Sequence, residues 1–158
     1  MRITLREYVP VDFEALYQID QACYEPGIAY SRRTLSEYLD LAAVDCVIAE
    51  RAGKIIGFCL TAREGSAGYI VTMDVLAAHR RSGVGTRLLA EAERRMEAAG
   101  VRRVALETAT DNVSAIAFWK KHGYRVRGVK KNYYPGGRDA FAMAKTIARE
   151  NPAPGPRG

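Results

Sequence analysis

The sequence predicts an α/β protein that has one mixed sheet with helices on both faces. Strand patterns and helix patterns are interspersed along the chain, and both hairpin turns and longer crossover segments connect the strands. Residues 69–100 give the strongest signal, because a strand pattern, a basic glycine turn and a long amphipathic helix follow one another directly. The 158 residues, 48% of them hydrophobic, suit a single domain with its own core, which we assign to residues 1–148.

The first part of the chain is expected to contain four strands and two helices. Ile3 and Leu5 alternate with polar residues, as in a half-buried strand, and Asp12 and Ser31 are suitable N-caps for the two helices. Ala52-Gly53-Lys54 favours a hairpin turn. The expected strands cover residues 2–9, 44–50, 55–62 and 69–76, and the expected helices cover residues 13–23 and 31–41.

The second part is expected to contain two helices and three strands. In the long helix the apolar residues Val84, Leu88, Leu89, Ala92 and Met96 share one side, and Gly100 ends it. The expected elements are a helix over 84–99, a strand over 101–108, a helix from Asp111 or Asn112 to the stop at His122-Gly123, a strand over 124–129, a loop over 133–138 and a strand over 140–147. The proline- and glycine-rich residues 149–158 are expected to be disordered.

Charge and composition narrow the class of protein. A net charge of +6 is compatible with a nucleic-acid binder, a ribosome-associated protein or a site for a phosphate-rich cofactor. The basic residues form scattered pairs, which favours a generally basic surface, and no direct nucleic-acid contact is expected. No apolar run is long enough to span a bilayer, and the first residues lack the apolar core of a signal peptide. The three cysteines lie in apolar settings, so we expect reduced thiols, no metal site and a cytoplasmic protein.

The glycine turn at residues 80–86 has the properties of an anion site. The first amides of a helix lack intrahelical partners and carry the positive end of the helix dipole, and glycines let a ligand approach them closely. Arg80 and Arg81 add positive charge. The alternative is an ordinary strand-to-helix turn with two solvated arginines. A dinucleotide fingerprint would need a third glycine, and a P-loop would need a lysine after the glycines, so neither motif fits.

Three motifs resemble one family. The pattern Arg80-x-x-Gly83-x-Gly85 resembles the acyl-CoA pyrophosphate loop of the GNAT N-acetyltransferase superfamily. A second motif runs from Asn112 through Ala115, Ile116, Phe118 and Trp119 to Gly123-Tyr124, and a third is Lys131-Asn132-Tyr133-Tyr134-Pro135. The third resembles the protein N-terminal acetyltransferases, including the ribosomal-protein-alanine type. The resemblance covers about residues 2–147 and implies the GNAT fold, with a mixed, mostly antiparallel central sheet.

The resemblance also implies acetyl-CoA as co-substrate and a set of residues that bind it. Backbone groups of Met73 and Val75 would pair with the pantetheine arm. The pyrophosphate would be held by Arg80, Arg81, Gly83, Val84, Gly85 and Thr86. Asn112, Ser114 and Trp119 would line the arm, although aromatic residues at helical spacing are more often core.

Glu107 is the candidate general base, and Tyr69 is the residue that would order a water beside it. Without the family, Glu107 would be interpreted as an outward carboxylate and Tyr69 as a core aromatic. An α-amine has a reference pKa of about 7.7 to 8.0, so roughly a tenth is neutral at pH 7, against about one lysine in a few thousand. A weak base relayed through water therefore suffices for an α-amine.

Trp119 departs from the family pattern. Many relatives carry a tyrosine there that can protonate the leaving thiolate, and an indole N–H cannot act as that acid. Either Tyr134 or Tyr133 supplies the proton, or the thiolate leaves without one, which a thiol pKa of about 8.5 permits. The second hypothesis is favoured.

The acceptor amine would enter between two segments that the resemblance brings together. These are the loop between the first two helices, with Tyr24, Glu25, Pro26 and Tyr30, and the loop that carries Tyr133 and Tyr134. The predicted function is acetyl transfer to the N-terminal α-amine of a protein or peptide, with a ribosomal protein as one candidate acceptor, by a monomer or weak dimer. Acetylation of a small-molecule amine or a lysine side chain is the alternative, and a non-catalytic acyl-CoA-binding module is a third hypothesis.

Overall fold

The computed structural model describes residues 2–147 and shows a seven-stranded sheet with helices on both faces. The predicted tail at 149–158 lies outside the described residues. The strand order is β1-β2-β3-β4-β5-β7-β6. Among these strands of residues 2–147 only β4 and β5 pair in parallel, which confirms the mixed, mostly antiparallel sheet. The strands are β1 (Ile3–Glu7), β2 (Val44–Arg51), β3 (Lys54–Glu64), β4 (Ala67–Val75), β5 (Arg103–Ala109), β6 (Arg125–Tyr134) and β7 (Arg138–Thr146).

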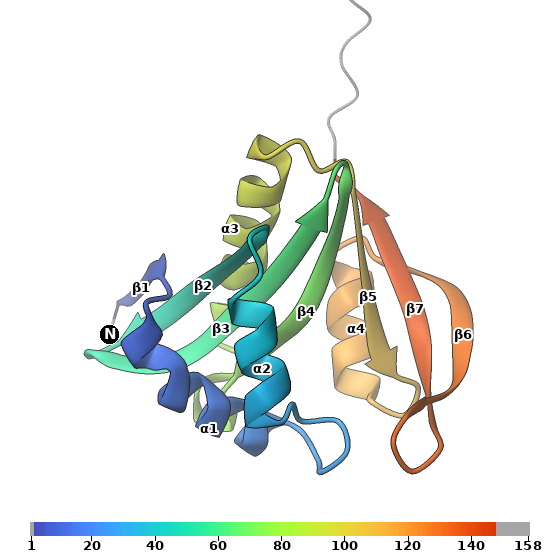
Figure 1. The fold of residues 1–158 in the computed structure, drawn as a ribbon, viewed down its shortest axis with the longest axis horizontal. Coiled ribbons are helices and arrows are strands. Elements are labelled where there is room, and N and C mark those ends of the chain that lie inside the picture. Colours follow the sequence, from blue (N-terminus) through green and yellow to red (C-terminus); the bar gives the residue numbers. More distant parts are fainter. Residues whose placement is uncertain (1, 148–158) are drawn as a thin grey trace, which may run out of the picture.

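Within the described part of the chain, four α-helices cover the sheet in two pairs. Helices α1 (Phe13–Cys23) and α2 (Arg32–Leu39) lie on one face, over β2 to β4, and α3 (Val84–Ala98) and α4 (Val113–Lys121) lie on the other (Figure 1). Each face has its own apolar cluster. In α3 the five residues predicted to face the core, Val84, Leu88, Leu89, Ala92 and Met96, are all buried. Within residues 2–147, none of the helices is long and apolar enough to cross a membrane.

The sheet opens at its centre, where β4 and β5 separate. The two strands pair only between Ala67–Tyr69 and Arg103–Ala105, and beyond that point they diverge (Figure 1). On its other side β4 remains paired to β3 as far as Val75. The later residues of β4 therefore present backbone groups to the gap, and a site forms between the two strands.

Two local predictions need correction. Asp12 precedes α1, but its side chain does not cap that helix; it accepts the Val9 amide at 2.9 Å and pairs with Arg6 at 2.8 Å. The expected loop over 133–138 is shorter, because β6 continues to Tyr134 after a bulge and pairs again with β7. The prediction for Ser31 is confirmed, since its hydroxyl accepts the Thr34 amide at 3.1 Å.

Candidate active site

A cleft of about 330 Å³ lies where β4 and β5 diverge. Its walls come from five segments: the α1–α2 loop, β4, β5, the start of α4 and the β6–β7 hairpin. Ten residues singled out from the sequence line it: Tyr24, Glu25, Tyr30, Tyr69, Met73, Glu107, Asn112, Trp119, Tyr133 and Tyr134. Pro26, Val75, Ser114 and residues 80–86 lie outside this lining. The structure thus brings together side chains that are more than a hundred residues apart.

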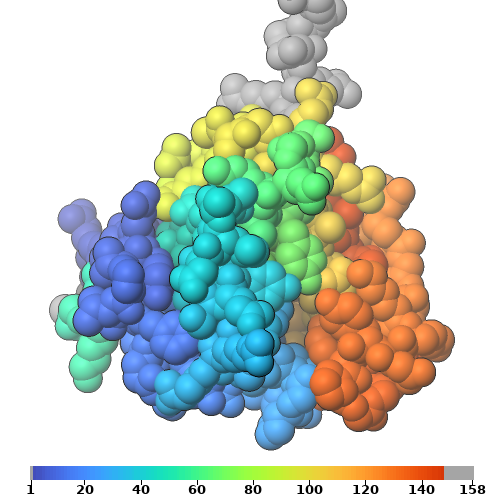
Figure 2. Space-filling model, in the orientation of Figure 1, coloured from blue at the N-terminus to red at the C-terminus, as the bar shows by residue number. Residues whose placement is uncertain are grey.

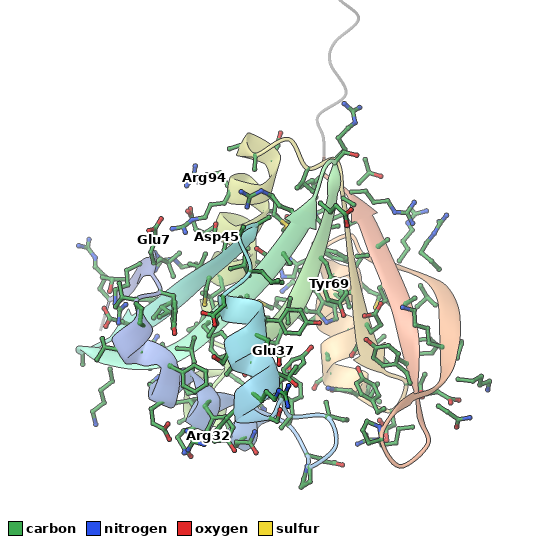
Figure 3. All side chains as sticks on the ribbon, in the orientation of Figure 1. Glu7, Arg32, Glu37, Asp45, Tyr69 and Arg94 are labelled. Carbon is green, nitrogen blue, oxygen red and sulfur yellow. The ribbon has the colours of Figure 1, made fainter. Side chains whose placement is uncertain are left out.

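Glu107 is the focus of the polar groups in the cleft. It sits near the end of β5, and its side chain is 9% exposed. The hydroxyls of Tyr69 and Tyr133 both donate to Oε1, Tyr133 at 3.0 Å, and the Lys130 ammonium donates to Oε2 at 3.0 Å. Figure 3 labels Tyr69 at the point where β4 and β5 part. Three donors therefore hold this carboxylate in one orientation.

The tyrosines of the cleft are proton donors at neutral pH. Burial, and then the hydrogen bond to Glu107, raise the pKa of Tyr69 above its ordinary value. Burial raises the pKa of Tyr133 as well, and it raises the pKa of Tyr134 to about 12. The hydrogen bond to Glu107 raises the pKa of Lys130, which stays cationic. In this group of residues the carboxylate is thus the group suited to accept a proton.

The open edge of β4 is hydrogen-bonded by the α1–α2 segment. Tyr24 donates its hydroxyl to the Met73 carbonyl at 2.9 Å, and Tyr30 donates to the Val71 carbonyl at 3.1 Å. Two side chains bond the Val75 carbonyl, Arg80 Nε at 2.9 Å and the Cys23 thiol at 3.5 Å. These contacts attach the loop beside the cleft to the strand that forms the cleft wall.

The glycine turn has a backbone suited to an anion. Arg81 and Gly83 both have positive φ, 63° and 82°, so the chain turns sharply before α3 begins. The Val84 side chain is buried, so only its backbone can contact a ligand. A Cβ on Gly85 would lie 3.2 Å from the Phe118 ring, so glycine allows α3 and α4 to pack closely. The free amides at the start of α3 and the adjacent arginines fit a diphosphate.

The residues predicted on α4 have distinct surroundings. Asn112 caps the helix by accepting the Ala115 amide at 3.2 Å, and the Ser114 hydroxyl donates to the same Asn112 oxygen at 3.3 Å. Trp119 is 7% exposed and belongs to the core, where its ring packs edge-on against Phe118 and also against Tyr124. It also reaches the lining of the cleft.

An arginine that sequence reasoning missed joins the segments at the cleft mouth. Arg138, at the start of β7, pairs with Glu25 at 2.8 Å and with Asp111 at 2.7 Å. The neighbouring loops also touch, because a Cβ on Gly27 would lie 3.4 Å from the Pro135 carbonyl. The space-filling view shows the blue α1–α2 segment against the orange hairpin (Figure 2). Lys130 was missed too, and no local pattern marks either residue.

Known proteins share this fold and sequence pattern. A model of the Acetyltransferase (GNAT) family matches residues 13–124. The N-alpha-acetyltransferase of Sulfurisphaera tokodaii is 32% identical over 113 residues, which cover 63% of this chain and 68% of that protein. The ribosomal protein bS18-alanine N-acetyltransferase of Escherichia coli is 26% identical over 148 residues, covering 92% of this chain and 98% of that protein. The crystal structure of the Escherichia coli ribosomal-protein-S18-alanine N-acetyltransferase matches with a TM-score of 0.86, over 95% of this chain and 98% of that chain. The chain therefore belongs to the acetyltransferase (GNAT) family and is an acetyl-CoA-dependent N-acetyltransferase.

Proposed function

We propose that the protein transfers the acetyl group to the N-terminal α-amine of a protein or peptide. One observation carries this proposal. A single carboxylate, Glu107, is held by Tyr69, Tyr133 and Lys130 in a cleft that opens between the α1–α2 loop and the β6–β7 hairpin. The other two carboxylates of the cleft lining, Glu25 and Asp111, are both paired with Arg138, which leaves Glu107 as the candidate base, and the tyrosine hydroxyls can hold a peptide backbone. Two of the relatives named above are N-terminal or α-amine acetyltransferases by their names.

The proposed base suits an α-amine better than a lysine. Roughly a tenth of α-amines are neutral at pH 7, so Glu107 needs only to accept a proton, directly or through one water, as the amine attacks. A lysine acceptor would first have to lose a proton from a group with a pKa of about 10.4.

The roles follow from the positions of the residues. Acetyl-CoA supplies the acetyl group as a thioester. The amine nitrogen bonds to the acetyl carbon, the carbon–sulfur bond breaks, and the amine proton passes to Glu107. Tyr69 and Tyr133 keep Glu107 oriented toward the amine. The thiolate leaves unprotonated in the favoured scheme, and Tyr134, which stays protonated, is the donor of the alternative scheme.

The donor-binding residues belong to this proposal as well. The amides of Val84, Gly85 and Thr86 and the side chains of Arg80 and Arg81 would bind the diphosphate of acetyl-CoA. Backbone groups of Met73 and Val75 would pair with the pantetheine arm, because they border the gap between β4 and β5. Asn112, Ser114 and Trp119 would flank the arm from α4, with Trp119 at the lining of the cleft.

The test is an acetylation assay on peptides of varied first residue. The protein is incubated with acetyl-CoA and each peptide, thiol release is followed, and the modified position is assigned by mass spectrometry. We expect α-amine acetylation that Glu107→Gln reduces by about 10² to 10⁴-fold, the usual contribution of a general base. Glu37→Gln, on the exposed surface of α2, is the matched control and should retain full activity. Acetylation confined to lysine side chains or polyamines would refute the proposal, as would coenzyme binding without turnover.

A further inference from the structure

One face of the sheet beyond the cleft is open. Helices α1 and α2 cover β2 to β4 on this face, and within residues 2–147 none of the helices lies over β5, β7 and β6 there (Figure 1). Directly paired residues share a face, so the pairs Arg103 with Thr146, Glu107 with Ala142 and Arg125 with Ala144 place all six side chains on it. We call this surface the open face. It begins at Glu107 and extends along β5 toward Arg103.

Three arginines gather here: Arg103 and Arg125 share the far end of the open face, and Arg127 lies next to them at the bulge of β6. They line a shallow hollow of about 430 Å³ whose side chains include Arg103, Arg125, Arg127, Ala144, Lys145 and Thr146. Lys145 is already neutralised, since its ammonium contacts both carboxylate oxygens of Glu93 at 2.9 and 3.1 Å. Among the described residues, no carboxylate pairs with the three arginines, and all three are exposed. Figure 3 shows nitrogen-tipped side chains beside the upper parts of β6 and β7.

The open face between Glu107 and this hollow carries small side chains on β5, β7 and β6. The residues of β5, β7 and β6 that share the open face between them are Ala105, Ala142, Ala144 and Gly128, all of them small. The large side chain at this level is Tyr69, which pairs with Ala105 from β4 and reaches Glu107 with its hydroxyl, so it borders the path on the β4 side. Arg103 precedes Glu107 by four residues in β5, which corresponds to about 13 Å along a strand. An extended peptide advances about 3.3 to 3.6 Å per residue. A chain whose first amine lies at Glu107 would therefore reach the arginines at about its fourth to sixth residue.

We propose that the open face binds the downstream part of the acceptor and that Arg103, Arg125 and Arg127 select acceptors with Asp or Glu at about positions four to six. This inference rests on the proposed function and adds a substrate class to it. Three observations support this inference. The open face is continuous with the cleft, the three arginines have no carboxylate partner among residues 2–147, and the distance from Glu107 to Arg103 matches four to six residues of an extended peptide. Each exposed ion pair contributes modestly, and two or three together give about a five- to tenfold preference.

The test compares peptides that are identical except at positions four to six, which are all Asp, all Ala or all Lys. The first residue is the one that supports the fastest turnover. The wild type, the double variant Arg103→Gln/Arg125→Gln and the charge-retaining Arg103→Lys/Arg125→Lys are assayed for kcat/KM. The matched control is Arg2→Gln/Lys54→Gln, which also removes two positive charges. These two residues lie near the opposite edge of the sheet, and neither has a side-chain partner among residues 2–147.

We expect kcat/KM to be about five- to tenfold higher for the Asp peptide than for the Lys peptide. The difference should lie in KM, and it should shrink as the salt concentration rises. The Gln double variant should lose this preference, and the Lys double variant and the control should keep it. Equal rates on all three peptides in the wild type would overturn the inference while leaving the proposed function intact. Failure to acetylate any peptide would instead overturn the proposed function and, with it, this inference. A third outcome would also overturn the inference: the Gln double variant keeps the preference among the three peptides but loses the ability of the wild type to bind an RNA oligonucleotide. The arginines would then be assigned to nucleic-acid binding.

Discussion

Substitution of Asp74 by asparagine is expected to stabilise the protein at neutral pH. Asp74 follows Met73 of the cleft lining in β4 and is 1% exposed, and Asp20 of α1 beside it is 0% exposed. Thr72 donates to Asp74 Oδ1 at 2.5 Å, but Asp74 Oδ2 and Asp20 Oδ1 have no hydrogen-bond partner among the described residues. Burial, and then the Asp20 carboxyl, raise the pKa of Asp74 well above its ordinary value. One proton between the two unpartnered oxygens satisfies both.

The sign and size of the effect follow from proton linkage. Between the unfolded pKa near 3.9 and the raised folded pKa, the native state binds the proton and the unfolded state does not. The free energy of unfolding therefore falls by about 1.4 kcal/mol per pH unit as the pH rises through this window. One proton can account for at most about 4 kcal/mol between pH 4 and pH 7. The side-chain amide that Asp74→Asn introduces can donate to Asp20 at every pH, so this variant lacks the slope.

The assay is urea unfolding of the wild type and Asp74→Asn at pH 4.5, 6 and 7.5, with m values compared to confirm two-state behaviour. We expect the variant to gain about 1 to 4 kcal/mol relative to the wild type across this range. Asp12→Asn is the control of opposite sign, because the Arg6 hydrogen bond lowers the pKa of Asp12 and its stabilisation is lost as the pH falls. Parallel pH profiles for Asp74→Asn and the wild type would refute the buried-proton explanation.

Three further predictions concern packing and catalysis. A Cβ on Gly57 would lie 2.5 Å from the Asp74 carbonyl, so Gly57→Ala should destabilise by about 3 kcal/mol in urea, whereas Gly128→Ala, with open space around it, should change stability by under about 1 kcal/mol. Tyr69→Phe removes one of three donors to Glu107 and should lower kcat about tenfold with an unchanged thermal midpoint; an unchanged kcat would show that its hydroxyl is dispensable. Trp119→Tyr should raise kcat by less than about tenfold, and a rise of tens of fold would show that thiolate protonation limits the wild type.

The elements of the fold could be predicted because their signals are local. The five buried residues of α3 follow from helical periodicity, and Ser31 follows from the preference for hydroxyls at N-caps. Glu107 could be selected by resemblance, but its partner Lys130 could not. The two residues lie on β5 and β6, which are separated in the sheet by β7, a strand that comes last in the sequence.

The register of the strands and the long-range ion pairs could not be predicted from the sequence. Bulges in β6 near Val126 and before Tyr134 shift the facing of its side chains, so alternation along that strand does not indicate which cations face the cleft. Arg138 pairs with Glu25, which is 113 residues earlier in the chain. A charged residue in a turn has many candidate partners, and only the folded chain selects one.

Hydrogen bonds join the segments that border the donor side and the acceptor side of the cleft. Asp20 in α1 accepts the Tyr30 amide at 2.7 Å, and the Tyr30 hydroxyl in turn bonds the Val71 carbonyl of β4. The same strand carries Asp74, whose carboxyl faces Asp20. The α1–α2 loop, which borders the acceptor entrance, is thus fixed to the strand edge that borders the gap between β4 and β5. The carbonyls of Val71 and Met73, which face the gap, therefore have hydrogen-bond partners where β5 departs, and the cleft is a consequence of the fold before any ligand binds.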